Sequence, residues 1–359
     1  MRIKALLVTH DIPEESIPWM AEVRDIFDEL VIFIDEKRVT PGTLAHAREE
    51  GSRVYCHNVE TWFEWDLAAM ARACESDWVL TIERDEQLSP EWRQSQWRQI
   101  LAGTQLTHFW VPRRWVVPGD RYITAAPWWP DSHPRLVRTD VSGASFPTRL
   151  HDFAHIPGSG GYLRSLAIHH HVLWLCSRTT REDRVRYYEQ LRPGGGLGHY
   201  YLYEDYAPPE APLPEPVQVE VDREVIRMEK LFPEEVSRIS LEVTAAPETV
   251  RVSSLFSLDA RVVNEANETL SSAPPYPVNL SYHWMEKANR QMIVFDGSRN
   301  GLFPSLAANA TARYAMAIIA PDQPGDYILQ TTMVQDGVGW FEDVRPGIVR
   351  EFDVSVIAR

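Results

Sequence analysis

The first half of the chain alternates short apolar runs with segments whose apolar residues recur at helical spacing. The apolar runs are Ala5–Thr9, Leu30–Ile34, Arg53–Cys56 and Trp78–Ile82, and the helical segments among them are Glu15–Phe27 and Glu64–Cys74. Alternation of strand and helix is typical of a parallel sheet with right-handed crossover connections. We therefore predict an α/β architecture with a parallel sheet for this part of the chain.

The pattern is less regular from Arg98 to Leu175. Short strands are predicted around Thr107–Pro112 and Tyr162–His171, and a charged helix at Arg181–Leu191. Residues 207–219 contain so many prolines that neither a helix nor a central strand is favoured. Such a segment is extended and fairly stiff, and we interpret it as a strap over the surface of the first domain.

After about Ser237 the chain changes to short alternating segments separated by turn residues. Seven such segments follow: Ile239–Val243, Leu255–Val263, Val278–Trp284, Gln291–Phe295, Ala312–Ile319, Tyr327–Gln335 and Glu351–Ile357. Regular short strands with almost no helical signal predict an all-β, immunoglobulin-like sandwich. We therefore expect two domains, residues 1–237 and residues 238–359.

Composition and charge narrow the classes of function. The formal net charge of −15 argues against binding to nucleic acid or to an anionic membrane, because both need a basic face. The three cysteines are odd in number and widely spaced, as expected of reduced thiols. No apolar stretch approaches the roughly 18 residues that would suggest a membrane span. The N-terminal residues do not have the pattern of a signal peptide, so we predict a cytoplasmic protein.

Three acidic residues follow the apolar run Trp78–Ile82, namely Glu83, Asp85 and Glu86. Ligands of open α/β sheets bind beyond the carboxyl ends of the strands. Carboxylates at that place can hold a hard divalent cation that bridges phosphates. The alternative interpretation is a solvated acidic turn. The runs near Ala5 and Leu30 should deliver polar residues to the same edge of the sheet, which favours the cation site.

Four segments resemble, in the expected order, the family 2-type glycosyltransferases of the GT-A fold. They are Asp77–Trp92 (DWVLTIERDEQLSPEW), Pro127–Arg138 (PWWPDSHPRLVR), Arg149–Phe153 (RLHDF), and Ala167–Leu175 (AIHHHVLWL) with the charged helix after it. The resemblance covers roughly residues 1 to 205. It implies a Rossmann-like GT-A domain with a mostly parallel sheet. It also implies an inverting transfer of sugar from a UDP- or GDP-linked donor, assisted by Mn²⁺ or Mg²⁺.

The resemblance assigns roles on the donor side to individual residues. Asp85 and Glu83 would hold the metal ion, with His170 as a further ligand. Thr9 and Asp35 would line the nucleotide pocket. Arg178 at the start of the charged helix, with Arg181, would reach the pyrophosphate. Alternatively, the side chains of His170, Arg178 and Arg181 face solvent and bind no ligand.

The acceptor side needs a general base beside the attacking hydroxyl. Asp152, in the pair His151-Asp152, is the first candidate for that base, and Asp131 is the second. The alternative for Asp131 is an ion pair with Arg135 or Arg138. His151, Arg135 and Trp129 are predicted to contact the substrate.

Two features favour a different class of function. Glu83 and Arg84 stand where the family has Asp and a small residue, as in a degenerate transferase domain that serves glycan binding or assembly. The segment Pro324–Asp343 is similar to β-sandwich modules of bacterial glycosyltransferases and polysaccharide-export proteins. In it Trp340 and Phe341 could stack on a sugar, or else fill the core. Expected partners are therefore a nucleotide sugar, a glycan, lipid-linked or protein acceptor, and a second copy or assembly partner bound through the sandwich.

Overall fold

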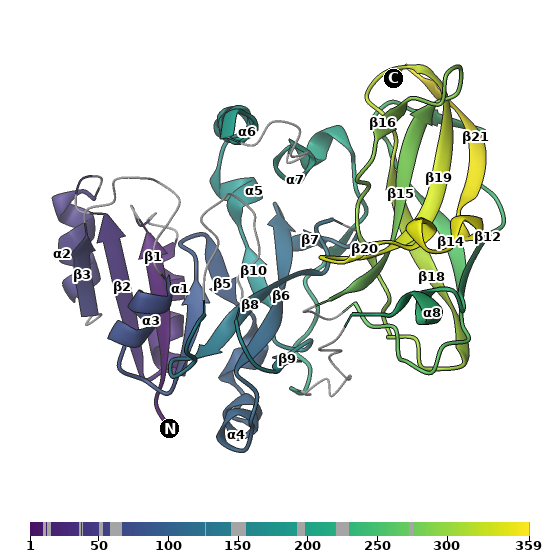
Figure 1. Ribbon diagram of the computed structural model, residues 1–359. Coiled ribbons are helices and arrows are strands. Elements are labelled where there is room, and N and C mark those ends of the chain that lie inside the picture. The colour runs from purple at the N-terminus through teal and green to yellow at the C-terminus, as the bar shows by residue number, and fades with distance from the viewer. Residues whose placement is uncertain are drawn as a thin grey trace. The chain divides into compact units, whose positions relative to one another are not determined.

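The computed structural model describes residues 1–9, 12, 16–35, 37, 39–49, 53–57, 67–125, 127–144, 156–191, 198–219, 230–272 and 276–358 (Figure 1). The chain divides into two compact units. The first unit comprises residues 1–123, 131–201 and 211–222, and the second comprises residues 124–130, 202–210 and 223–359. Each unit has a hydrophobic core of its own.

Four parallel strands form one half of the sheet in the first unit. They are β1 (Ile3–Thr9), β2 (Glu29–Asp35), β3 (Arg53–His57) and β4 (Trp78–Ile82), in the order β4-β1-β2-β3. The helices α1 (Ile17–Ile26), α2 (Pro41–Glu49) and α3 (Leu67–Ala73) connect them. Every residue of β4 is buried, because the strand has neighbours on both sides and is apolar on both faces. The carboxyl ends of these strands meet at one edge, as the sequence predicts.

The other half of this sheet is not parallel. It contains β5 (Glu86–Leu88), β6 (His108–Val117), β7 (Arg121–Ile123), β8 (Asp131–Arg138), β9 (Gly160–Tyr162), β10 (Ile168–His170) and β11 (Glu210–Pro212). Strand β8 runs antiparallel to both β4 and β6. Strand β10 lies between β5, to which it is antiparallel, and β6, to which it is parallel.

The predicted fold class, a Rossmann-like and mostly parallel α/β domain of the GT-A type, is wrong. Strand accounts for 40% of the structure and helix for 22%, and the large sheets are mixed. The sequence signal for parallel strands ends at Ile82, and the prediction extended it to residues that do not carry it. Strand β6 continues past Pro112 to Val117, and its long antiparallel pairing with β8 changes the character of the sheet.

Short helices and an extended strap complete the first unit. The helices are α4 (Gln96–Ala102), α5 (Val172–Leu175), α6 (Arg178–Leu191) and α7 (Gly198–Tyr201). The proline-rich strap lies against the first unit in residues 211–219, where Leu213 N donates to Asp120 O at 2.9 Å. Among the described helices, none is long and apolar enough to cross a membrane.

The second unit consists of two sheets around a shared core. Its elements are α8 (Pro233–Val236), β12 (Ile239–Val243), β13 (Thr249–Arg251), β14 (Leu255–Asn264), β15 (Val278–Glu286), β16 (Met292–Val294), β17 (Asn300–Gly301), β18 (Ala310–Ile319), β19 (Gly325–Gln335), β20 (Gly339–Trp340) and β21 (Arg350–Ile357). One sheet has the order β12-β14-β18 and the other β13-β21-β19-β15-β16. Each of the seven predicted segments contains a strand. Phe341 is buried in the core, as the second interpretation of that residue expected, whereas Trp340 is partly exposed.

Candidate metal centre

The turn between β4 and β5 fixes the three acidic residues in place. Glu83 N donates to Glu86 Oε2 at 2.8 Å, and Glu86 N donates to Glu83 O at 3.1 Å. His171 N donates to Asp85 O at 2.8 Å and thereby ties the turn to the end of β10. The carboxylates therefore stand on a backbone that is hydrogen-bonded on both sides.

Strand β10 brings a histidine to these carboxylates. Its register places His170 beside Glu86 of β5 and Trp115 of β6. The Trp115 ring meets the buried imidazole edge-on, with centroids 4.5 Å apart. Nε2 of His170 lies 3.5 Å from Oδ2 of Asp85. One ligand atom each from Glu83, Asp85 and His170 lies within 4.8 Å of the others, so the three predicted metal ligands meet at one place.

The chemistry of this group fits a divalent cation. Two carboxylates suit Mg²⁺ or Mn²⁺, and the imidazole favours a transition-metal ion over Mg²⁺. Nδ1 of His170 is buried, and among the described residues it has no hydrogen-bond partner. Buried polar atoms nearly always have one. Nε2 is the ring nitrogen nearest to Asp85, so it is the nitrogen that would face a cation at the carboxylates. The Glu83 side chain is half exposed, which gives the group access to solvent.

Two buried arginines from neighbouring strands already balance part of the negative charge. Arg135 of β8 contacts Oε1 of both Glu83 and Glu86, at 2.8 and 2.5 Å. Arg113 of β6 lies 3.4 Å from Glu86 and 3.8 Å from Glu83. Burial acts to raise the pKa of Glu83, but Arg135 and Arg113 together lower it to about 2. Burial prevails at Glu86, whose pKa is raised. A cation would therefore share Glu83 with Arg135.

Asp85 is the carboxylate that the arginines of β6 and β8 do not hold. Burial acts to raise its pKa, but His170 and then Arg184 and Arg84 bring it well below its usual range. The group is thus ionised at neutral pH although it is buried. A cation bound beside Asp85 would further stabilise the ionised form of this buried carboxylate.

Asp131 belongs to a different part of the network. Its Oδ2 accepts from Arg113 Nη2 at 2.7 Å and from Trp115 Nε1 at 2.7 Å, and its Oδ1 lies 3.0 Å from His133 Nε2. Arg113, the largest influence after burial itself, holds the pKa of Asp131 far below its usual range. These contacts favour the ion-pair interpretation of Asp131, with Arg113 as its partner in place of Arg135 or Arg138.

The predicted nucleotide contacts lie at two different places. Thr9 and Asp35 end β1 and β2, are buried, and lie at the same edge of the parallel strands as Glu83. Arg178 instead pairs with Glu182 on its own helix, at 3.0 Å. Arg181 is buried and donates to the backbone carbonyls of Cys176 and Tyr201.

The remaining predicted substrate contacts do not join the group. His151 and Asp152 lie outside the described residues. Trp129 belongs to the second unit, is half-buried, and donates its backbone N–H to Ala125 O at 3.1 Å. Of the predicted substrate contacts, Arg135 is the one that the structure places beside the metal ligands.

Sequence reasoning missed Arg113 and Trp115, which carry much of the network. Both lie on β6, two residues apart, and so they share a face of the strand. The prediction placed a short strand around Thr107–Pro112, which stops before both residues. The run His108–Val117 does not alternate between polar and apolar residues and is buried throughout, so its periodicity gave no signal that could have found them.

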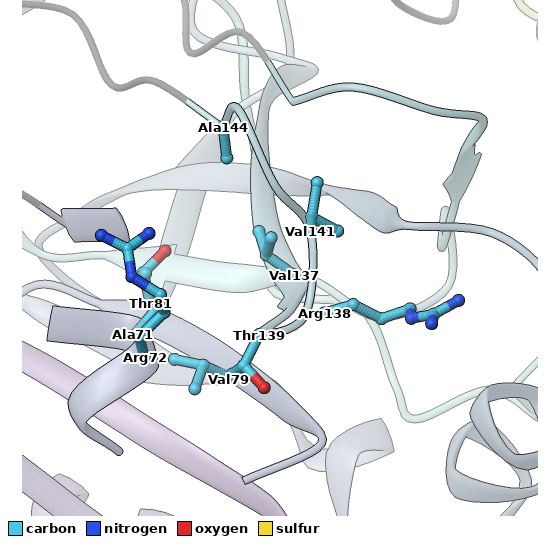
Figure 2. A pocket seen from close by; sticks show the side chains of 9 residues that line it. All are labelled: Ala71, Arg72, Val79, Thr81, Val137, Arg138, Thr139, Val141 and Ala144. Carbon is cyan, nitrogen blue, oxygen red and sulfur yellow. The ribbon is translucent and has the colours of Figure 1, made fainter. Parts of the chain in front are cut away.

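A recess lies against β4 and β8, the strands that precede Glu83 and carry Arg135. Figure 2 shows its lining side chains, which come from α3, β4, β8 and the segment after β8: Ala71, Arg72, Val79, Thr81, Val137, Arg138, Thr139, Val141 and Ala144. Val79 and Thr81 are two residues apart on β4, so both point to one side of the strand. Thr81 Oγ1 donates to Arg135 O at 3.3 Å, which links the recess to the arginine that holds Glu83.

No family model and no curated protein sequence matches the chain. Among solved structures, the chain is similar to glucosyl-3-phosphoglycerate synthase from Mycobacterium tuberculosis in complex with phosphoglyceric acid. The identity is 18%, the coverage is 33% of this chain and 45% of that one, and the TM-score is 0.24. The alkylpurine DNA glycosylase AlkC of Pseudomonas fluorescens is 12% identical, with coverage of 34% of this chain and 31% of that one and a TM-score of 0.23. A beta-glucosidase from Listeria innocua is 10% identical, with coverage of 33% of this chain and 16% of that one and a TM-score of 0.23. The chain spans less than half of each of these proteins, and likenesses this weak support no inference about function.

Proposed function

We propose that the chain binds Mn²⁺ or Mg²⁺ at Glu83, Asp85 and His170 and transfers sugar, with inversion, from a nucleotide-diphospho-sugar. One observation carries the proposal. Three donor groups from the turn after β4 and from β10, distant in the sequence, lie within 4.8 Å of one another. A cation held there would neutralise the leaving diphosphate and orient it.

The surrounding residues suit such a donor. Asp85 is ionised, and Glu83 is half exposed and within reach of a ligand in solvent. Arg113 and Arg135 provide fixed positive charge beside Glu83, which would offset part of the negative charge of a bound diphosphate. Thr9 and Asp35 lie at the same sheet edge and are the proposed nucleotide contacts. Asp152 remains the proposed base, and the acceptor would be a glycan, a lipid-linked glycan or a protein in the cytoplasm.

A second candidate function has its own supporting observation. Arg135 and Arg113 already neutralise Glu83 and Glu86, so two of the three acidic residues of the turn are compensated by the protein without a cation. Removing one partner of such a buried pair is costly, so the arginines can be retained for structure alone. In that case the chain would be a non-catalytic glycan-binding or assembly protein.

Isothermal titration with Mn²⁺, and then with UDP- and GDP-sugars, distinguishes the two functions. We expect Mn²⁺ to bind the wild type and to bind Asp85→Ala about 100-fold more weakly, because a ligand is lost. Asp140→Ala is the control, since this exposed carboxylate pairs with Arg138 outside the site.

The outcomes separate clearly. Binding of a nucleotide sugar that requires Mn²⁺ supports the transferase. Mn²⁺ binding without any nucleotide binding contradicts the transferase proposal. A wild-type chain that binds neither Mn²⁺ nor any nucleotide also contradicts it, and supports the second candidate, in which the protein's own arginines compensate Glu83 and Glu86.

A further inference from the structure

Strand β8 carries an aspartate and a histidine that form a bonded pair. Nε2 of His133 lies 3.0 Å from Oδ1 of Asp131, and the two residues stand two positions apart on one face of the strand. The other oxygen of Asp131, Oδ2, accepts from Arg113 and from Trp115, both at 2.7 Å. The carboxylate is therefore held from behind, and it holds the imidazole in front of it.

The hydrogen bonds determine which nitrogen of the His133 ring carries the proton. Burial acts to raise the pKa of Asp131, but Arg113 holds it far below its usual range, so the carboxylate is ionised and can only accept. Nε2 of the neutral ring must then be the donor, which leaves a lone pair on Nδ1. Within the described part of the chain, Nδ1 makes no hydrogen bond. The pair thus presents an oriented proton acceptor.

The pair is accessible and lies next to the proposed cation site. The His133 side chain is 38% exposed, whereas the other histidines whose side chains the structure describes are at most 5% exposed. The guanidinium of Arg113 contacts Asp131 through Nη2, at 2.7 Å, and Glu83 through Nη1, at 3.8 Å. One side chain therefore separates the carboxylate behind His133 from the half-exposed carboxylate of the cation group.

We propose that His133, oriented by Asp131, is the general base of the transfer in place of Asp152. This inference rests on the proposed function. Nδ1 takes the proton of the acceptor hydroxyl as its oxygen bonds to the anomeric carbon of the donor sugar, while the bond from that carbon to the diphosphate oxygen breaks. The nucleoside diphosphate leaves with the electron pair of that bond. The imidazolium, which Asp131 stabilises, then releases its proton to solvent.

Release of nucleotide from a donor, with water as the acceptor, tests the base without knowledge of the natural acceptor. The full chain is incubated with Mn²⁺ and UDP-glucose, UDP-N-acetylglucosamine or GDP-mannose, and free UDP or GDP is measured by chromatography. We expect His133→Ala to release nucleotide about 100-fold more slowly than the wild type, with unchanged binding of Mn²⁺ and nucleotide. Imidazole in the buffer should restore part of the rate of this variant and leave the wild type unchanged.

Asp131→Asn tests the orientation of the ring. Its amide oxygen would face the donors of Arg113 and Trp115, so its amide nitrogen would donate to Nε2, which moves the ring proton to Nδ1 and removes the base. The rate should fall about tenfold or more, and imidazole should not restore it, because the ring still fills the place. Ser132→Ala is the matched control, since this hydroxyl bonds to Tyr162 on the other face of β8, and it should keep the wild-type rate.

The outcomes separate the base from the proposed function, and circular dichroism verifies the fold of each variant. A wild type that binds no nucleotide overturns both. When the wild type binds a donor, the base alone is overturned by the absence of nucleotide release, by a wild-type rate in His133→Ala, or by a lack of rescue with imidazole. A rate that Asp152→Asn abolishes and His133→Ala leaves intact would return the role to Asp152.

Discussion

Each unit contains a buried histidine beside a carboxylate, and the two pairs differ in how completely they are bonded. In the second unit, His283 Nε2 lies 2.8 Å from Glu342 Oε1, and Nδ1 bonds to the carbonyl of Phe295. The Phe295 ring stacks on the imidazole at 5.1 Å. In the first unit, His170 Nε2 lies 3.5 Å from Asp85, and Nδ1 is buried without a hydrogen bond among the described residues.

The difference separates a structural pair from one that is open to a ligand. Every polar atom of the His283 ring is used by the protein itself, so this pair fixes the packing of β15 against its neighbours. The His170 ring makes one long contact and leaves one nitrogen unsatisfied, which is costly in a buried place. A cation between Asp85 and Nε2 of His170 would replace the long 3.5 Å contact and would leave Nδ1 as it is, whereas no ligand is needed at His283.

The largest effect should come from Arg135, because it determines whether the acidic turn depends on the protein's own charges. We expect Arg135→Ala to lower the free energy of unfolding by about 3–5 kcal/mol in metal-free buffer, since it leaves the fully buried Glu86 carboxylate poorly paired. Urea denaturation measures this. Arg138→Ala removes an exposed pair with Asp140 and should cost no more than about 1 kcal/mol. A loss equally small for Arg135→Ala would mean that the network does not hold the turn.

The comparison itself is tested by removing each histidine ring. His283→Ala and His170→Ala both delete a buried side chain, so the cost of the cavity is shared. His283→Ala also breaks a hydrogen bond to a carboxylate and should cost about 1.5–3 kcal/mol more. Hydrogen exchange read separately for β15 and for β10 measures each unit. An equal or greater loss for His170→Ala would show that His170 is as firmly bonded as His283.

The sequence predicts the core of the site better than the fold around it. Trp78–Ile82 is found to the residue, because five residues of strand character stand between polar neighbours. That Asp85 and His170 lie close together was predicted only from the resemblance to the glycosyltransferases, because periodicity does not say which strands pair. For the same reason, the sequence does not predict that β6 and β8 pair in an antiparallel arrangement. Arg113 is buried only because Asp131 and Glu86, both on other strands, neutralise it.

The last prediction concerns another buried histidine, which has no role at either site. His108 begins β6 and bonds to Thr107 Oγ1 at 3.0 Å through Nδ1. Burial lowers its pKa to about 4 from an ordinary value of 6.5. The folded protein thus disfavours the protonated ring. The contribution of the neutral His108 ring to the free energy of unfolding is therefore complete above about pH 6.5. This contribution is lost as the pH falls toward 4, by at most about 1.4 kcal/mol per pH unit.

An NMR titration of the His108 ring protons checks the pKa, and urea unfolding from about pH 7 to about pH 4 checks the linkage. His108→Phe removes the titrating group while it keeps a ring in the same space, so its unfolding free energy should depend less on pH over that range. A His108 resonance that titrates near 6.5 would contradict the prediction. It would also mean that burial without a carboxylate partner is not enough to keep a histidine neutral in this sheet, and the contrast between His170 and His283 would then rest on their hydrogen bonds alone.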